Sequence, residues 1–204
     1  MSQQQDTYKT IESPSRGYFK DKGSKFLSFA YPVNSIEEVE NRIKSIKKQY
    51  HDARHHCYAF VLAPDQKTYR ASDDGEPSNS SGPPILGQIR SKNLTNVLIV
   101  VPRYFGGTKL GIPGLINAYK SAAEYALDKA KIIEKTMNEK LKIEFQYPNM
   151  GDVMRLVKEH NLTVAEQDFS LECKLIVEVR KSNVEKVLQS FKPFYEVTVT
   201  PIDE

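Results

Sequence analysis

A glycine-rich stretch with basic and aromatic residues has the composition of an anion-binding loop. The segment Arg103-Tyr-Phe-Gly-Gly-Thr-Lys-Leu-Gly-Ile-Pro-Gly114 follows an apolar run and precedes a predicted helix. Glycines let backbone N–H groups approach an anion, and a helix N-terminus adds partial positive charge. An aromatic ring here could also stack on a base. The alternative is that the glycines permit tight packing. The candidate binding residues are Arg103, Tyr104, Gly106, Gly107, Lys109 and Gly111.

An acidic segment supplies a second group of polar side chains. Ser72-Asp-Asp-Gly-Glu-Pro-Ser78 places Asp73, Asp74 and Glu76 within four positions. These carboxylates could hold Mg²⁺ through oxygen ligands or act as an acid–base pair. The favoured alternative is a turn in which aspartates accept backbone N–H bonds while Gly75 takes a positive φ. We therefore expect no cofactor, with Mg²⁺ as the one ion that this segment could bind.

Two adjacent histidines lie beside an arginine in His51-Asp-Ala-Arg-His-His-Cys57, so Arg54, His55 and His56 are further candidate binding residues. Because the segment leads into a predicted strand, the two histidines should point to opposite faces. That geometry argues against a metal site, and the sequence offers no second cluster at a zinc spacing. A nucleophilic pair of Cys57 with a histidine is disfavoured for the same reason.

Charge is distributed unevenly along the 204 residues. Residues 1–137 contain 20 Lys and Arg against 14 Asp and Glu, whereas residues 138–204 contain 9 against 12. The first part could face an anionic partner such as RNA, although a merely soluble surface explains the same balance. The N-terminus lacks a signal-peptide pattern, and the longest apolar run, residues 97–101, is too short to span a membrane. We expect a cytoplasmic protein with no membrane partner.

The elements around these segments predict a first α/β domain over residues 1–136. Residues 8–11 alternate polar and apolar positions and are expected to be extended. A hairpin is expected where residues 17–19 and 24–31 flank a turn. A helix over about residues 35–50 begins with a capping box of Ser35 and Glu38. Strands are predicted at 56–62, 67–70 and 95–101, the last buried on both faces. A loop at 73–84, a short helix at 85–92 and a helix at 113–131 complete the domain.

Residues 137–204 predict a second domain with a different pattern. A strictly alternating strand at 140–146 is followed by a helix at 151–160 and strands at 163–168 and 171–179. A helix at 182–191, capped by Ser182, and a strand at 195–200 follow. This β-α-β-β-α-β order is ferredoxin-like, so the whole chain is of the α/β (α+β) class, with a boundary near residues 134–139.

Three ordered motifs resemble the signature of the IMPACT/YigZ family. They are Arg54-His-His-Cys-Tyr-Ala-Phe60, the acidic segment at residues 72–78 and the start of the glycine-rich stretch at residues 103–111. The chain departs from the family pattern at residues 79–82, where the family commonly reads Gly-Thr-Ala-Gly. It departs again at 113–119, where the family commonly reads Gly-Gly-Leu-x-Arg-Ala-Tyr. Pro113 removes one N–H from the predicted anion site, and Asn117 removes one positive charge.

The resemblance implies a first domain of the ribosomal protein S5 domain 2-like kind and a second resembling a domain of translation elongation factor G. Eukaryotic relatives regulate translation initiation, and bacterial relatives have been suggested to bind nucleic acid. We expect a translation-linked regulatory or binding protein that contacts RNA, the ribosome or a translation-associated protein through the basic glycine-rich loop.

The resemblance carries over no catalytic residue. An alternative is a Mg²⁺-dependent enzyme acting on a phosphorylated small molecule or nucleotide. A third hypothesis is that the protein is a scaffold in which the motifs only stabilise the fold.

Overall fold

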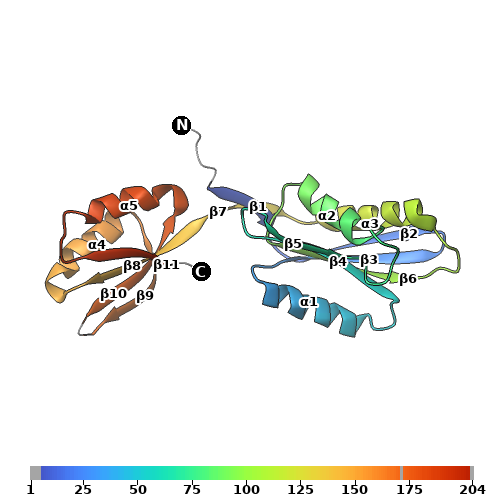
Figure 1. Cartoon of the computed structure of the whole chain (residues 1–204), viewed down its shortest axis with the longest axis horizontal. Coiled ribbons are helices and arrows are strands. Elements are labelled where there is room, and N and C mark those ends of the chain that lie inside the picture. Colours follow the sequence, from blue (N-terminus) through green and yellow to red (C-terminus); the bar gives the residue numbers. More distant parts are fainter. Residues whose placement is uncertain (1–5, 171, 203–204) are drawn as a thin grey trace. The chain divides into compact units, whose positions relative to one another are not determined.

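A computed structural model describes residues 6–170 and 172–202 (Figure 1). Residues 8–135 form one compact unit, and residues from 136 onward form the other together with Asp6 and Thr7. Asp6 belongs to this second unit because its carboxylate accepts hydrogen bonds of 2.6 and 3.0 Å from Arg180. The first residues of the chain and Leu171, where a strand was expected to begin, lie outside the described ranges. No helix in those ranges combines the length and the apolarity that a membrane crossing requires.

The first unit is built on a five-stranded antiparallel sheet with the order β2-β3-β6-β4-β5. Its strands are β2 (Ser15–Asp21), β3 (Ser24–Pro32), β4 (His55–Leu62), β5 (Thr68–Ser72) and β6 (Val97–Tyr104). The central strand β6 is buried on both faces, as its unbroken apolar run predicted. The hairpin of β2 and β3 turns at Lys22 and Gly23, which both have positive φ.

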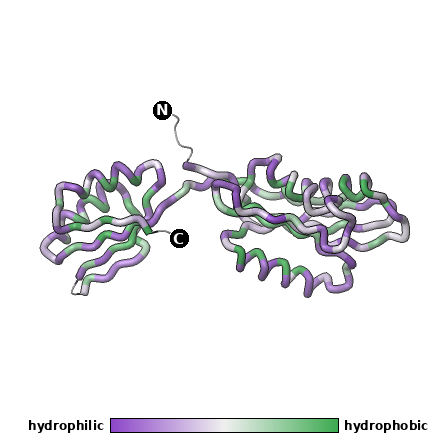
Figure 2. Tube along the Cα trace, in the orientation of Figure 1, coloured by the Kyte–Doolittle hydropathy of each residue, from purple (hydrophilic) through white to green (hydrophobic). Residues whose placement is uncertain are grey.

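Helices cover both faces of this sheet (Figure 1). Helix α1 (Ile36–Gln49) packs Val39 and Ile46 on one face, and Figure 2 shows its alternating apolar and polar positions. Helices α2 (Gly82–Ser91) and α3 (Gly111–Asp128) pack on the other face around a second cluster. The capping box at α1 differs from the usual one in the hydrogen bond that the glutamate accepts. Ser35 Oγ accepts from Glu38 N, but Glu38 Oε2 accepts from the backbone N–H of Asn34.

The second unit has a four-stranded antiparallel sheet with the order β11-β8-β10-β9. Its elements are β8 (Asn138–Phe145), α4 (Met150–Glu159), β9 (Thr163–Phe169), β10 (Cys173–Arg180), α5 (Val184–Phe191) and β11 (Thr198–Ile202). This order and the central β8-β10 pair confirm the ferredoxin-like prediction. The predicted cap was wrong, because a 3₁₀ turn at Lys181–Asn183 precedes α5 and makes Asn183 its N-cap.

One strand pair was predicted only in part, because residues 8–11 were expected to be extended but their partner strand was not expected. β1 (Thr7–Ile11) pairs with β7 (Ile132–Thr136) in a two-stranded sheet. Most of β7 is exposed, so its sequence lacks the apolar alternation that identifies a half-buried strand.

Candidate functional site

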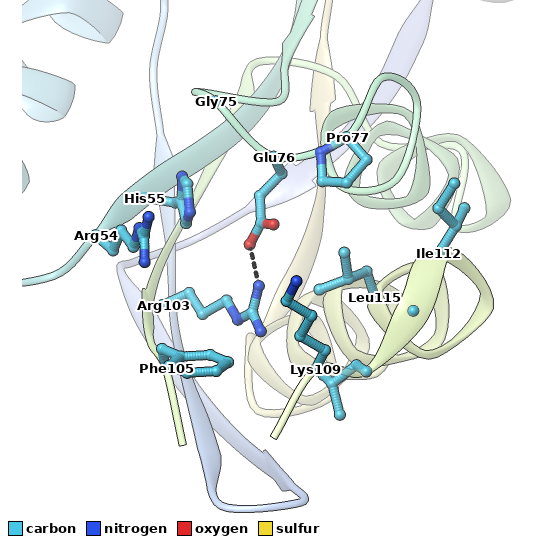
Figure 3. A pocket seen from close by; sticks show the side chains of 12 residues that line it. Arg54, His55, Gly75, Glu76, Pro77, Arg103, Phe105, Lys109, Ile112 and Leu115 are labelled. Atoms are coloured by element: carbon cyan, nitrogen blue, oxygen red, sulfur yellow. Dashed lines mark hydrogen bonds and ion pairs between the residues drawn. The ribbon is translucent and has the colours of Figure 1, made fainter. Parts of the chain in front are cut away.

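Segments from three parts of the first unit line one pocket of about 480 Å³ (Figure 3). His55 begins β4 and Arg54 directly precedes it. Glu76 comes from the loop between β5 and α2, and Arg103 from the end of β6. The rest of the wall comes from Gly75, Pro77, Phe105, Lys109, Leu110, Gly111, Ile112 and Leu115. The three motifs of the sequence therefore meet at one site.

A buried ion pair lies in the wall of this pocket. Arg103 Nη1 donates to Glu76 Oε1 at 2.6 Å, and the two side chains are only 8% and 4% exposed. The Tyr119 hydroxyl donates to the same oxygen at 2.7 Å, and Arg103 Nη2 donates to Ser24 Oγ at 3.4 Å. Because a buried charge is costly without a partner, Glu76 and Arg103 fix each other's position.

Tyr119 and Cys57 extend this network into the core. Cys57 Sγ lies 3.3 Å from the Tyr119 hydroxyl and 3.0 Å from the carbonyl oxygen of Asp73. Burial raises the pKa of the Cys57 thiol to about 12, and burial also raises the pKa of Tyr119. A protonated, buried thiol is a poor nucleophile, so Cys57 contributes packing and hydrogen bonding.

Asp73 caps the N-terminus of helix α2. Its Oδ1 accepts from the backbone N–H groups of Ser81 and Gly82 and from the Ser81 hydroxyl, and its Oδ2 accepts from Asn79 N. Burial opposes ionisation, but these hydrogen bonds outweigh it and hold the Asp73 pKa below its usual range. This cap explains why α2 begins at Gly82, three residues before the predicted start.

Asp74 also satisfies backbone and side-chain donors outside the pocket. It accepts from His56 N at 2.7 Å and from Lys47 Nζ at 2.9 Å, and it is followed by Gly75 with φ +87°. Burial raises the Asp74 pKa, and the Lys47 and His56 hydrogen bonds more than offset this and lower it. Of the three acidic residues only Glu76 lines the pocket, which is the geometry of the turn interpretation. Within the described ranges, no group of three metal-ligating side chains is assembled.

The two histidines point to opposite faces of β4, as predicted. His55 lines the pocket, and its Nδ1 lies 2.8 Å from the Asp74 carbonyl oxygen. Since a carbonyl only accepts, Nδ1 carries the hydrogen, and in the neutral ring Nε2 is left as an acceptor. His56 is buried, with Nε2 2.9 Å from the carbonyl oxygen of Tyr50.

The loop glycines meet different structural needs. A Cβ at Gly106 would lie 1.9 Å from the carbonyl carbon of Gly23, so this glycine allows the loop to pack on the β2-β3 turn. Its N–H donates to Ser24 Oγ at 3.2 Å and is not available to a ligand. Gly107 and Gly111 have φ values of +87° and +72°, which glycine adopts at low cost.

The aromatic residue at the pocket is Phe105, and Tyr104 is not among the lining residues. Neighbouring residues at the end of β6 point in different directions. The Tyr104 hydroxyl donates to Asp52 Oδ1 at 2.7 Å, and this bond raises the Tyr104 pKa to about 12. Phe105 is 47% exposed and lines the pocket, so a ligand there can contact its ring.

Helix α3 begins at the pocket without a side-chain cap among the described residues. Its N-cap is Leu110, and its first turn contains no acidic residue. Gly111 and Ile112 line the pocket, so their end of the helix contributes partial positive charge there. Pro113 follows them and supplies no N–H, as the sequence indicated.

The apolar part of the pocket wall was not predicted from the sequence. It consists of Pro77, Leu110, Ile112 and Leu115, beside Phe105. One signal was available, because Leu110 and Ile112 are large apolar residues inside a glycine-rich loop that has no strand or helix period of its own.

Comparison with known proteins identifies the family. The family model of the Impact N-terminal domain matches residues 22–127, which include all three motifs. The chain is 30% identical to IMPACT family member YvyE of Bacillus subtilis over 87% of this chain and 82% of that protein. It is 30% identical to IMPACT family member YigZ of Escherichia coli over 72% and 74% of the two chains.

A solved structure shares both units of the fold. That structure, described as a hypothetical protein, is 25% identical, has a TM-score of 0.77 and is matched over 98% of each chain. Together with the family match and the two relatives, this establishes that the chain belongs to the IMPACT family.

Proposed function

We propose that this chain is a translation-linked binding protein whose first unit contacts RNA, alone or within a ribosome, through the pocket and its basic rim. Membership of the IMPACT family supports the link to translation. The observation that carries the proposal is the convergence of three separate motifs on one pocket with Arg54, Arg103 and Lys109 in its wall.

The charge of the first unit supports an anionic partner. Residues 7–136 contain 20 Lys and Arg against 13 Asp and Glu. Arg54 and Lys109 are exposed, and no ion pair within the described part of the chain engages either of them. Their charges are therefore available to phosphate groups.

The test is co-sedimentation with ribosomes and with free RNA across a salt titration. In the Arg54→Ala, Lys109→Ala double variant, we expect weaker association and a salt slope reduced by roughly 1–2, because two phosphate contacts are lost. Arg103 is left intact, since its removal would strand the buried carboxylate of Glu76.

A matched control removes the same charge elsewhere. Lys67 follows β4 and Lys129 caps the far end of α3, so both lie at the ends of these elements opposite to the pocket. The Lys67→Ala, Lys129→Ala variant should bind like the parent protein. Equal weakening in both variants, or no association of the parent at any salt, would contradict the proposal.

An enzyme acting on a phosphorylated small molecule is the second candidate. The observation in its favour is that the acidic and glycine-rich loops share one pocket. The oxygens of Asp73 and Asp74 are occupied by the fold, so a Mg²⁺ site built from all three carboxylates has no support. Incubation with nucleotides and Mg²⁺, followed by ³¹P NMR, separates the candidates, because only an enzyme converts its ligand.

A further inference from the structure

The buried guanidinium in the pocket wall has a donor without a partner. Both Nη atoms of Arg103 are engaged, by Glu76 and Ser24, but Nε forms no hydrogen bond in the part of the chain that the structure describes. Buried side-chain donors nearly always have an acceptor. Nε itself is shielded from solvent, so a ligand in the pocket meets the positive charge of Arg103, whose side chain is 8% exposed, rather than this donor.

The charges around the pocket favour an anionic ligand. Figure 3 shows Arg54, Arg103 and Lys109 around the same space. Among the described residues that line it, Glu76 is the one acidic side chain, and its Oε1 already accepts two hydrogen bonds. The uncapped first turn of α3 adds partial positive charge to the same wall.

The ligand must be larger than an inorganic anion. Phe105 and Ile112 are 47% and 53% exposed, and they lie beside Leu110, Leu115 and Pro77. Phosphate alone would leave this apolar wall in contact with water. The volume of about 480 Å³ lies within the roughly 300–1,000 Å³ of pockets that enclose small molecules.

We propose that the pocket holds one unstacked nucleotide, with its phosphate near Lys109 and the first turn of α3 and its base against Phe105. An aromatic ring at the edge of a basic, concave site suits a base that has left its stack, whereas the backbone of a duplex lies on a convex surface. This inference rests on the proposed function, since it names the part of the RNA that enters the site.

The first experiment is calorimetric titration of the full chain with adenosine and uridine 5′-monophosphates at low salt. Inorganic phosphate and the two nucleosides are the comparison ligands. We expect each monophosphate to bind at least tenfold more tightly than phosphate or its own nucleoside. The monophosphate contacts both the basic and the apolar part of the pocket wall, whereas phosphate and the nucleoside each contact only one.

Two variants test the apolar and the basic part of the pocket wall separately. Phe105→Ala should weaken monophosphate binding about tenfold through the loss of stacking, and Lys109→Ala should weaken it with a reduced salt dependence. Tyr18→Ala is the matched control. Tyr18 is also 47% exposed. Its neighbours Gly17 and Phe19 face helix α3, and side chains alternate along a strand, so Tyr18 lies on the opposite face of β2. Its replacement should leave binding unchanged.

Competition with oligonucleotides identifies the source of the nucleotide. Displacement by a linear 5′-phosphorylated single strand but not by its circular form assigns a strand end. Equal displacement by both assigns an internal nucleotide, and displacement by neither assigns a free mononucleotide. The first two outcomes support the inference, whereas displacement by neither would refute that a nucleotide of an RNA strand enters the pocket.

Other outcomes overturn the inference. Absence of monophosphate binding while ribosomes or RNA still co-sediment would refute the nucleotide pocket and leave the proposed function standing. Phosphate binding as tight as that of the nucleotides, with no effect of Phe105→Ala, would reduce the site to an anion site. Absence of both kinds of binding would refute the proposed function itself.

Discussion

At the scale of single residues, Glu76 links the pocket to the core. Its carboxylate accepts from Arg103 in the pocket wall and from Tyr119, whose hydroxyl lies beside the buried Cys57. Arg103 also lies 5.4 Å from the centre of the Phe26 ring, which fixes its plane further. A guanidinium held in this way is ordered before any ligand arrives, so binding incurs little conformational entropy at this side chain.

We predict that Glu76→Gln lowers the free energy of unfolding of the first unit by about 3 kcal/mol, because it leaves the buried Arg103 charge without a counter-ion. Glu40→Gln, at an exposed position of α1, should change it by less than about 0.5 kcal/mol. Urea titration followed by circular dichroism measures both. A Glu76→Gln change as small as that of the control would show that the ion pair contributes little to stability.

The three acidic residues of residues 72–78 show why the site could be predicted only in part. In the sequence, Asp73, Asp74 and Glu76 are equivalent carboxylates in a turn. The structure separates them, because Asp73 caps α2, Asp74 binds the start of β4, and only Glu76 reaches the pocket. These roles depend on partners that are far away in the sequence, and no local pattern encodes them.

At the scale of elements, the loop between β6 and α3 is shaped by glycines of two kinds. Gly106 is required by close packing against Gly23 and Ser24, whereas Gly107 has open space around it and is required only by its positive φ. The tight-packing interpretation of the loop therefore applies to Gly106, and the anion-binding interpretation stays a prediction for the segment after Gly107. Gly106 serves the fold, and the segment after Gly107 leads Lys109 and α3 to the pocket.

We predict three distinct outcomes for glycine-to-alanine changes. Gly106→Ala should destabilise by about 2 kcal/mol or more, because its Cβ meets backbone atoms. Gly107→Ala should cost roughly 1 kcal/mol for its left-handed backbone. Gly87→Ala, inside α2 with no atom near its Cβ, should stabilise by about 0.5–1 kcal/mol. Thermal and urea unfolding of the three variants gives the order, and equal effects at Gly106 and Gly107 would disprove the packing role.

At the scale of the whole molecule, the order of elements was readable because each has a clear apolar period. The unbroken apolar run of β6 and the strict alternation in β8 identified two central strands, and the ferredoxin-like order followed. The exposed β7 has no such period and was missed. The full lining of the pocket could not be predicted either, because it depends on how the start of β4, the end of β6 and the start of α3 lie beside one another.

The two units also differ in charge, and this difference locates the predicted binding activity. A fragment of residues 7–136 keeps β1, β7 and every pocket residue, with 20 basic against 13 acidic side chains, whereas residues 137–204 carry 9 against 12. We predict that the first fragment co-sediments with ribosomes and RNA with the salt slope of the full chain, because the phosphate contacts lie within it. The second fragment should remain in the supernatant.

Circular dichroism of each fragment is the control for folding. Both fragments contain a complete sheet with its own buried cluster, so each has the core that independent folding requires. If the folded second fragment carried the association and the folded first fragment did not, the basic pocket would not be the contact. The binding surface would then have to be sought on the ferredoxin-like sheet and its two helices, α4 and α5, where the excess of acidic residues favours a basic protein partner over RNA.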